Sequence, residues 1–169
     1  QGTAPDLGAD EIQGAAYLTN DAAQVTFKSP EGTVTELSVP SDAITGPLTL
    51  VYSQLSTPTV PEGFLFAGQT FDLSAYRDGV ALGGIAFSSP VTLSLTYTDA
   101  DVAGIDEQQL YVYSWNTAIG SWEDAACGEY DRHPEMNWLA LPICHLSEYA
   151  LFGEQIADSY VYLPLVVRK

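Results

Sequence analysis

Residues 91–97 read VTLSLTY, a run in which apolar side chains alternate with hydroxyl-bearing ones. Successive side chains of a β-strand point to opposite faces, so the valine, the two leucines and the tyrosine share one face. This alternation is typical of an antiparallel strand that packs one face on a core and leaves the other in water. The run therefore predicts a half-buried antiparallel strand.

The same period of two recurs along the chain in short runs that Gly, Pro, Asn and Asp separate, and no stretch keeps helical spacing. These runs predict further strands at residues 25–28, 33–39, 48–55, 69–75, 110–115, 122–126, 138–143 and 149–152. A short helical turn with Asp or Thr as its N-cap is expected around residues 98–107. So many short strands predict an all-β fold, an antiparallel two-sheet β-sandwich with extended terminal segments.

The chain has 169 residues, enough for one substantial core. Its hydrophobic fraction of 46% predicts a folded domain despite a formal net charge of −17. We expect three parts along the chain. Residues 1–24 form an N-terminal extension that serves as an exchanged or edge strand, residues 25–156 form the sandwich, and residues 157–169 form an apolar tail.

The charge balance restricts the partners, because five Lys and Arg residues stand against 22 Asp and Glu. Neutralising phosphates requires a basic patch, so the composition argues against nucleic acid and anionic membrane surfaces. No apolar run approaches the length that spans a bilayer. The chain begins at Gln1, which indicates a removed leader or a fragment, and its Ser, Thr, Gly and Tyr content favours a secreted or cell-surface protein.

The two cysteines, Cys127 and Cys144, lie close together in the sequence. In an oxidising compartment they would form a disulfide, and the chain-entropy estimate for so short a loop is ~3 kcal/mol. Two buried thiols in a cytosolic core are the alternative, because pairing cannot be read from sequence.

Residues 160–169 read YVYLPLVVRK, an apolar, β-prone run that ends in two of the five cationic residues. A free strand of this kind invites pairing with another chain unless something covers it. Pro164 lacks a backbone donor, so the segment should pair along a sheet edge or insert into a groove. The predicted assembly strand consists of Tyr160, Val161, Tyr162, Leu163, Leu165, Val166 and Val167.

Four acidic residues that could converge on Ca²⁺ are Asp99, Asp101, Asp106 and Glu107. The EF-hand spacing fails here, because Ala103 stands at its third ligand position and Leu110 at its final glutamate. A capped turn is therefore favoured over a metal site, and no cofactor is expected. The spacing of these carboxylates does not establish a glycosidase pair either.

Six motifs spread along the chain carry a family resemblance: SPEG (29–32), VPSDAI (39–44), FAGQTF (66–71), PVTLSLTYTDADVAGID (90–106), LYVYSW (110–115) and HLSEYALF (145–152). Together they resemble the ZU5-like β-sandwich modules of bacterial surface proteins, especially those of Chloroflexota-type bacteria. The run YLPLVVR (162–168) also resembles the carboxyl ends of proteins secreted by such bacteria. The resemblance implies a fold and a location rather than an activity.

The tripeptide His145-Leu146-Ser147 is similar to the cleavage sites of autoproteolytic ZU5 domains and adhesion-receptor GAIN domains. This resemblance implies that Ser147 Oγ attacks the Leu146 carbonyl, that His145 accepts the hydroxyl proton and that the resulting ester hydrolyses. Local strain would lower the barrier to the first step. The alternative is a His and a Ser with ordinary hydrogen bonds, which is favoured, so no enzyme activity and no catalytic residue are expected.

Tyr111, Tyr113 and Trp115 repeat at a period of two and therefore share one face of a strand. They would form either a glycan-stacking platform or aromatic packing between the sheets. His133 lies in the polar segment 130–134, where a solvated or hydrogen-bonded histidine is expected.

The leading functional hypothesis is an extracellular structural or adhesive protein that associates with itself or with a cell-envelope partner. In its specific form, subunits join head to tail into a filament, and an end strand of one subunit completes the sheet of the next. An autoproteolytic module and a carbohydrate-binding module are the two alternatives.

Overall fold

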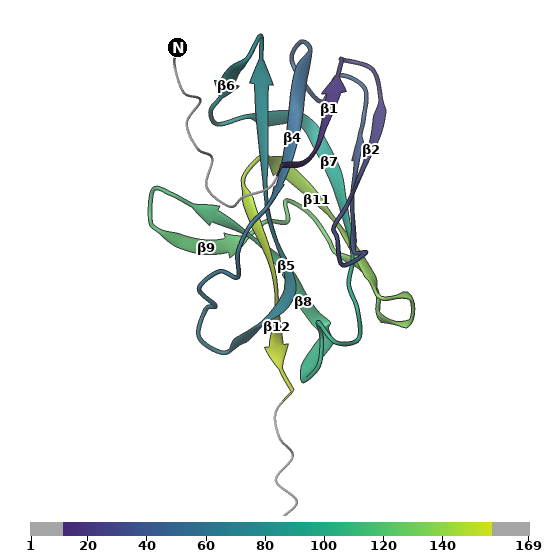
Figure 1. Cartoon of the computed structure of the whole chain (residues 1–169), viewed down its shortest axis with the longest axis vertical. Helices are drawn as coiled ribbons and strands as arrows, with labels where there is room; N and C mark the ends of the chain where they lie inside the picture. Colours follow the sequence, from purple (N-terminus) through teal and green to yellow (C-terminus); the bar gives the residue numbers. More distant parts are fainter. Residues whose placement is uncertain (1–11, 157–169) are drawn as a thin grey trace, which may run out of the picture.

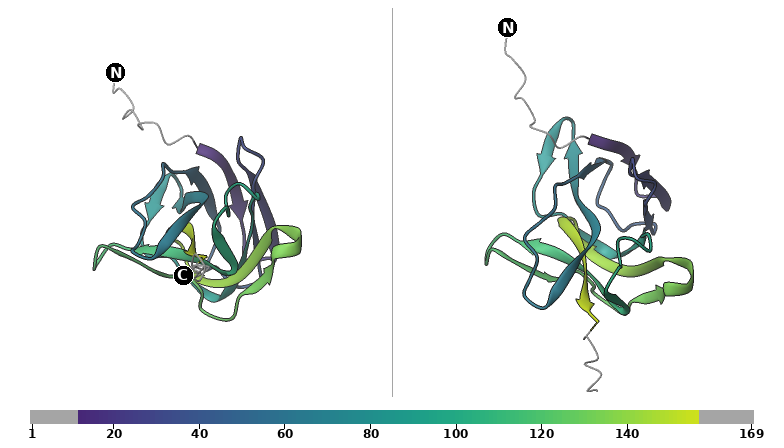
Figure 2. Two further views of the ribbon diagram at one scale, coloured as in Figure 1. Left: turned by 90° about the horizontal axis from the view of Figure 1, so that it is seen from below. Right: turned by 60° about the horizontal axis from the view of Figure 1, so that its bottom comes forward.

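The computed structural model describes residues 12–156, which form two antiparallel β-sheets packed face to face (Figures 1 and 2). The larger sheet has the order β1 (Ile12–Leu18), β4 (Leu48–Gln54), β5 (Phe64–Arg77), β12 (Glu148–Gln155), β8 (Ile105–Asn116) and β9 (Ser121–Asp124), with β6 (Val80–Leu82) beside β5. The smaller sheet has the order β10 (Asp131–His133), β11 (Trp138–His145), β7 (Ala86–Thr96), β3 (Val34–Val39) and β2 (Ala23–Lys28). The predicted all-β, two-sheet sandwich is confirmed.

A 3-10 turn at Pro134–Met136 is the one helical element within residues 12–156. This described part contains no helix that is long and apolar enough to cross a membrane.

The predicted strand at residues 91–97 forms most of β7, at the centre of the smaller sheet. Val91, Leu93 and Leu95 are at most 1% exposed, whereas the Thr and Ser side chains between them are exposed or half-buried. Leu93 lies opposite Leu37 on β3 and Leu141 on β11, so three leucines share one layer. The alternation in the sequence therefore corresponds to a buried and a solvated face.

A row of aromatic rings crosses the core between the sheets. Phe27 stacks on Tyr52 with 4.9 Å between ring centroids, and Tyr52 stacks on Phe71 at 5.1 Å. Phe71 then contacts Tyr149 at 5.6 Å, so the row reaches the central strand β12. The Phe27–Tyr52 contact joins the smaller sheet to the larger one, and the other two contacts continue the row within the larger sheet.

The helical turn expected around residues 98–107 is instead a pair of hydrogen-bonded turns. The amide of Asp101 bonds the Thr98 carbonyl at 3.0 Å, and the amide of Ile105 bonds the Val102 carbonyl at 2.9 Å. Gly104 has a φ of +81°, and Ile105 pairs with Gln155 in the larger sheet. The positive φ and the sheet pairing stop the chain from continuing as a helix.

The sequence-based prediction placed an exchanged or edge strand within residues 1–24 without giving its bounds, and it did not locate β6 and β10 as strands. β1 lies within the predicted N-terminal extension and pairs with β4 of the same chain as the outer strand of the larger sheet. The predicted assembly strand at residues 160–167 lies outside the described residues.

Candidate functional site

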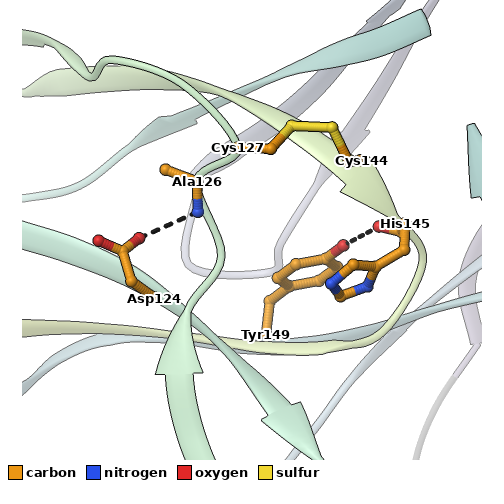
Figure 3. The surroundings of a disulfide bond; sticks show 6 residues. All are labelled: Asp124, Ala126, Cys127, Cys144, His145 and Tyr149. Atoms are coloured by element: carbon orange, nitrogen blue, oxygen red, sulfur yellow. Dashed lines mark hydrogen bonds between the residues drawn. A yellow bond between two sulfur atoms is a disulfide. The ribbon is translucent and has the colours of Figure 1, made fainter.

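The structure pairs Cys127 and Cys144 in a disulfide, with their Cα atoms 6.0 Å apart (Figure 3). The bond joins the segment that follows β9 to the end of β11. The amide of Cys127 also donates to the carbonyl of Pro142 at 2.9 Å, and Asp124 accepts the amide of Ala126 at 2.9 Å. Covalent and hydrogen bonds therefore hold this loop beside His145.

The His-Leu-Ser step connects β11 of the smaller sheet to β12 of the larger one. Ser147 Oγ donates to the carbonyl of Trp115 at 3.2 Å, and His145 Nδ1 lies 3.3 Å from the carbonyl oxygen of Leu146. Figure 3 shows the Tyr149 hydroxyl donating to the backbone carbonyl of His145. Ser147 is thus hydrogen-bonded away from the base that cleavage would require.

The backbone at residues 145–147 has neither a cis peptide bond nor a positive φ. No hydrogen bond joins the Ser147 hydroxyl to the His145 imidazole, the contact that the cleavage hypothesis requires. Self-cleavage stays a hypothesis, and its signature would be a fragment beginning at Ser147 in denaturing electrophoresis.

A hollow of ≈ 480 Å³ opens beside this step. The residues that line it are Trp115 and several polar residues, which include Asp72, Asn116, Glu123, His145, Ser147 and Glu148. Burial raises the pKa of the Asp72 carboxyl, and the hydrogen bond from the Ser74 hydroxyl opposes this shift. An aromatic wall with hydrogen-bonding groups around it suits a hydroxyl-rich ligand.

The aromatic residues predicted to share one face of a strand lie on the outer face of the larger sheet. On β8, Leu110 and Val112 point into the core, whereas Tyr111, Tyr113 and Trp115 are half-buried on the opposite side. The alternative of aromatic packing between the two sheets is therefore wrong for these three rings.

Phe152 of β12 is fully buried at the centre of this outer face. Its ring contacts Tyr113 at 5.6 Å, Trp122 at 5.5 Å and Phe66 at 6.3 Å. Trp122 Nε1 donates to the carbonyl of Thr59 at 3.1 Å, which ties the β4–β5 loop to the cluster. Sequence reasoning missed Phe152 and Trp122, although the unbroken apolar run at residues 149–153 indicates a strand covered on both faces.

The four acidic residues considered for Ca²⁺ do not converge. Asp99 accepts from Asn137 at 2.6 Å, Asp106 accepts the amide of Gln108 at 3.0 Å and Glu107 accepts the hydroxyl of Tyr97 at 3.0 Å. Asp101 instead accepts from Thr98, within its own turn. Across residues 12–156, no three or more His, Cys, Asp or Glu side chains form a group able to hold a metal.

His133 is hydrogen-bonded, as the sequence predicts. Its Nδ1 lies 2.9 Å from Glu135 and its Nε2 lies 2.9 Å from Asp131, while its ring stacks on Trp138 at 4.4 Å. The hydrogen bond to Glu135 is the main cause of its raised pKa. The residue therefore holds the β10–β11 turn together.

Compared with the models of known protein families the chain matches none, and a search of the curated proteins finds no match. The resemblance to ZU5-like modules therefore stays a prediction. What the structure shows is the broader class, a disulfide-linked two-sheet β-sandwich.

Proposed function

We propose that this protein is an extracellular structural subunit that assembles head to tail, the apolar segment 157–169 of one copy pairing with the β1–β2 edge of the next. The observation that carries the proposal is the pair of open sheet edges on one flank of the sandwich. A strand that adds to such an edge gains backbone hydrogen bonds and buried side chains.

The acceptor edge consists of the outer strands of both sheets, joined by the turn at residues 19–22 and lying side by side (Figure 2). A shallow groove of ≈ 640 Å³ runs between the strands, lined by residues 14–18 and 23–28. β1 has no large side chain at Gly14, Ala15 and Ala16. Tyr17 beside them is 69% exposed, so the edge offers both backbone groups and apolar surface.

Part of the opposite edge of the larger sheet is blocked by side chains. Beyond the short strand β9, the amide of Val112 on β8 donates to the Tyr130 hydroxyl at 3.1 Å. Further along, Arg132 Nε donates to the carbonyl of Leu110 at 3.0 Å. Side chains thus occupy backbone groups that would pair with an added strand, which favours the β1–β2 edge as the acceptor.

The donor segment follows β12, which ends toward the lower end of the molecule in Figure 1. β1 lies in the upper half of the same view, so donor and acceptor belong to different ends of the sandwich. Contacts between different surfaces propagate head to tail instead of closing a two-fold dimer. Arg168 and Lys169 would also meet a neighbour whose net charge is strongly negative.

Deleting residues 157–169 is expected to abolish assembly and to leave the sandwich folded. Electron microscopy over a range of concentrations should show filaments of the full chain and dispersed particles of the truncated one, while thermal melting of the two stays alike. A synthetic peptide of residues 157–169 should shorten the filaments by capping acceptor edges, and a scrambled peptide should not. Filaments that form equally well without the segment would refute its role.

A matched pair of variants tests the acceptor edge. Ala15→Lys places a charge on β1, and Ile119→Lys adds the same charge to the exposed β8–β9 loop on the other side of the view in Figure 1. We expect filament loss with the first variant alone, because an edge lysine opposes strand addition. Equal assembly by both variants would exclude β1 as the acceptor.

A carbohydrate-binding module is the second candidate, favoured by the position of Trp115 between the outer aromatic cluster and the hollow. Affinity electrophoresis in polysaccharide gels should then show retention that Trp115→Ala removes, since stacking on a sugar requires the ring. Tyr17→Ala is the control, because its ring is exposed on β1. Absence of retention on every glycan, or equal loss with both variants, would count against this candidate.

A further inference from the structure

A histidine between two carboxylates closes the hairpin of β10 and β11 at the outer edge of the smaller sheet. His133 Nδ1 lies 2.9 Å from Glu135 Oε1, and His133 Nε2 lies 2.9 Å from Asp131 Oδ1. Trp138 lies directly opposite His133 in the strand pairing, and the two rings stack with their centroids 4.4 Å apart. The imidazole therefore meets an acidic group at each nitrogen and an aromatic ring on one face.

This set of contacts is complete only with the protonated ring. An ionised carboxylate accepts hydrogen bonds but donates none, and a neutral imidazole has one N–H donor and one lone pair. In neutral His133 one carboxylate would face that lone pair, whereas the imidazolium donates to Asp131 and Glu135 at once. The face of the Trp138 indole also favours a positive charge on the stacked ring. Loss of one proton therefore removes one hydrogen bond and both ion-pair attractions.

The groups around the imidazole also favour its charged form. The hydrogen bond with Glu135 is the main cause of the raised pKa of His133, and the charge of Asp131 adds to it, while burial opposes the shift. The same hydrogen bond lowers the pKa of Glu135, which also faces the phenol of Tyr97, just after β7. Arg132 turns to the larger sheet, where it bonds β8. His133 is therefore the group that changes charge near neutral pH.

β10 is a short outer strand. It has three residues and pairs with β11 alone, at the edge of the smaller sheet opposite β2. The turn that follows is held separately, because the amide of Asn137 donates to the Pro134 carbonyl at 3.2 Å and its side chain donates to Asp99 at 2.6 Å. Loss of the His133 contacts should therefore loosen β10 and leave the turn at residues 134–137 in place.

We propose that the β10–β11 hairpin is a pH-sensitive switch, closed while His133 is protonated and loosened when the ring loses its proton. Because the folded hairpin raises the pKa of this histidine, its stabilising effect is complete below the ordinary value of about 6.5 and is lost as the pH rises through the higher value. β10 covers the edge of β11, so its release leaves backbone groups of β11 open to another strand.

Titration of the full chain, followed by NMR of the imidazole C2 protons, should give His133 a midpoint above about pH 6.5. The chain has two histidines, so His145→Gln assigns the signal. Glu135→Gln should lower the midpoint, because it removes one of the two carboxylates. Glu129→Gln is the matched control, since it removes the same charge from the same disulfide-closed loop, outside the contacts of His133. A midpoint at or below about pH 6.5, or an equal fall in both variants, would overturn the proposal.

Hydrogen exchange measures the opening itself. Between about pH 5 and about pH 9, the protection factors of amides at residues 131–133, corrected for intrinsic rates, should fall, while those of β7 should not. By linkage, the fold-change should equal the ratio of the His133 acid constants in the open and closed hairpin, so the two experiments must agree. His133→Phe keeps a ring on Trp138 and cannot titrate, so its protection should stay constant. A fall of the same size in this variant, or constant protection in the original chain, would contradict the switch.

Discussion

Replacing Phe152 with alanine is expected to lower the free energy of unfolding by about 3–5 kcal/mol, as for a fully buried ring in a core. The side chain points away from the space between the sheets, yet it is 0% exposed because Phe66, Tyr113 and Trp122 surround it. Urea denaturation followed by tryptophan fluorescence and circular dichroism measures the change.

Phe66→Ala is the matched control for this prediction, because it removes the same ring from the half-buried rim of the cluster. A smaller loss is expected there, since less apolar surface returns to water. If both variants lose the same amount, or if Phe152→Ala loses less than about 1 kcal/mol, the outer cluster is not a second core.

The outer cluster also explains why β12 lacks the alternation of β7. Tyr149 and Leu151 of β12 face the inner core, and Ala150 and Phe152 face the outer cluster, so every residue from Tyr149 to Gly153 is buried. A central strand covered on both faces has no polar face to display. Loops and the short strand β9 supply the outer cover.

The alternation of apolar and polar residues correctly located strands that have one face in water, as at residues 91–97. It failed at β5, where the bulge at Gly68 shifts the period and the strand runs from Phe64 to Arg77 instead of 69–75. β6 and β10 have three residues each, so their partners rather than their own pattern define them. Period counting cannot detect such strands.

The candidate sites show the same division. Trp115, His145 and Ser147 were selected from the sequence, and the structure brings all three to one hollow. Asp72 in that wall comes from β5, and only the tertiary fold places it there. The acidic residues at 99–107 are close in sequence, but two successive turns direct them to different partners. Carboxylates that are close in the sequence therefore do not meet at one site in the fold.

The double variant Cys127→Ser, Cys144→Ser is expected to lower the free energy of unfolding by ~3 kcal/mol, the cost of releasing a short closed loop in the unfolded chain. The two cysteines are 17 residues apart, and the loop they close contains β10 and the turn that His133 stabilises. Urea denaturation of the oxidised chain and of the variant gives the difference directly.

Reductant provides the control for this prediction. Adding dithiothreitol should bring the oxidised chain to the stability of the double variant and should leave the variant unchanged. The folded sandwich should survive in both, because the buried core between the sheets does not include the sulfur atoms. Hydrogen exchange should then quicken at residues 125–130, where Cys127 anchors the loop to Pro142. Unchanged stability on reduction would mean that the hydrogen bonds of Asp124 and Tyr130 hold this loop without the disulfide.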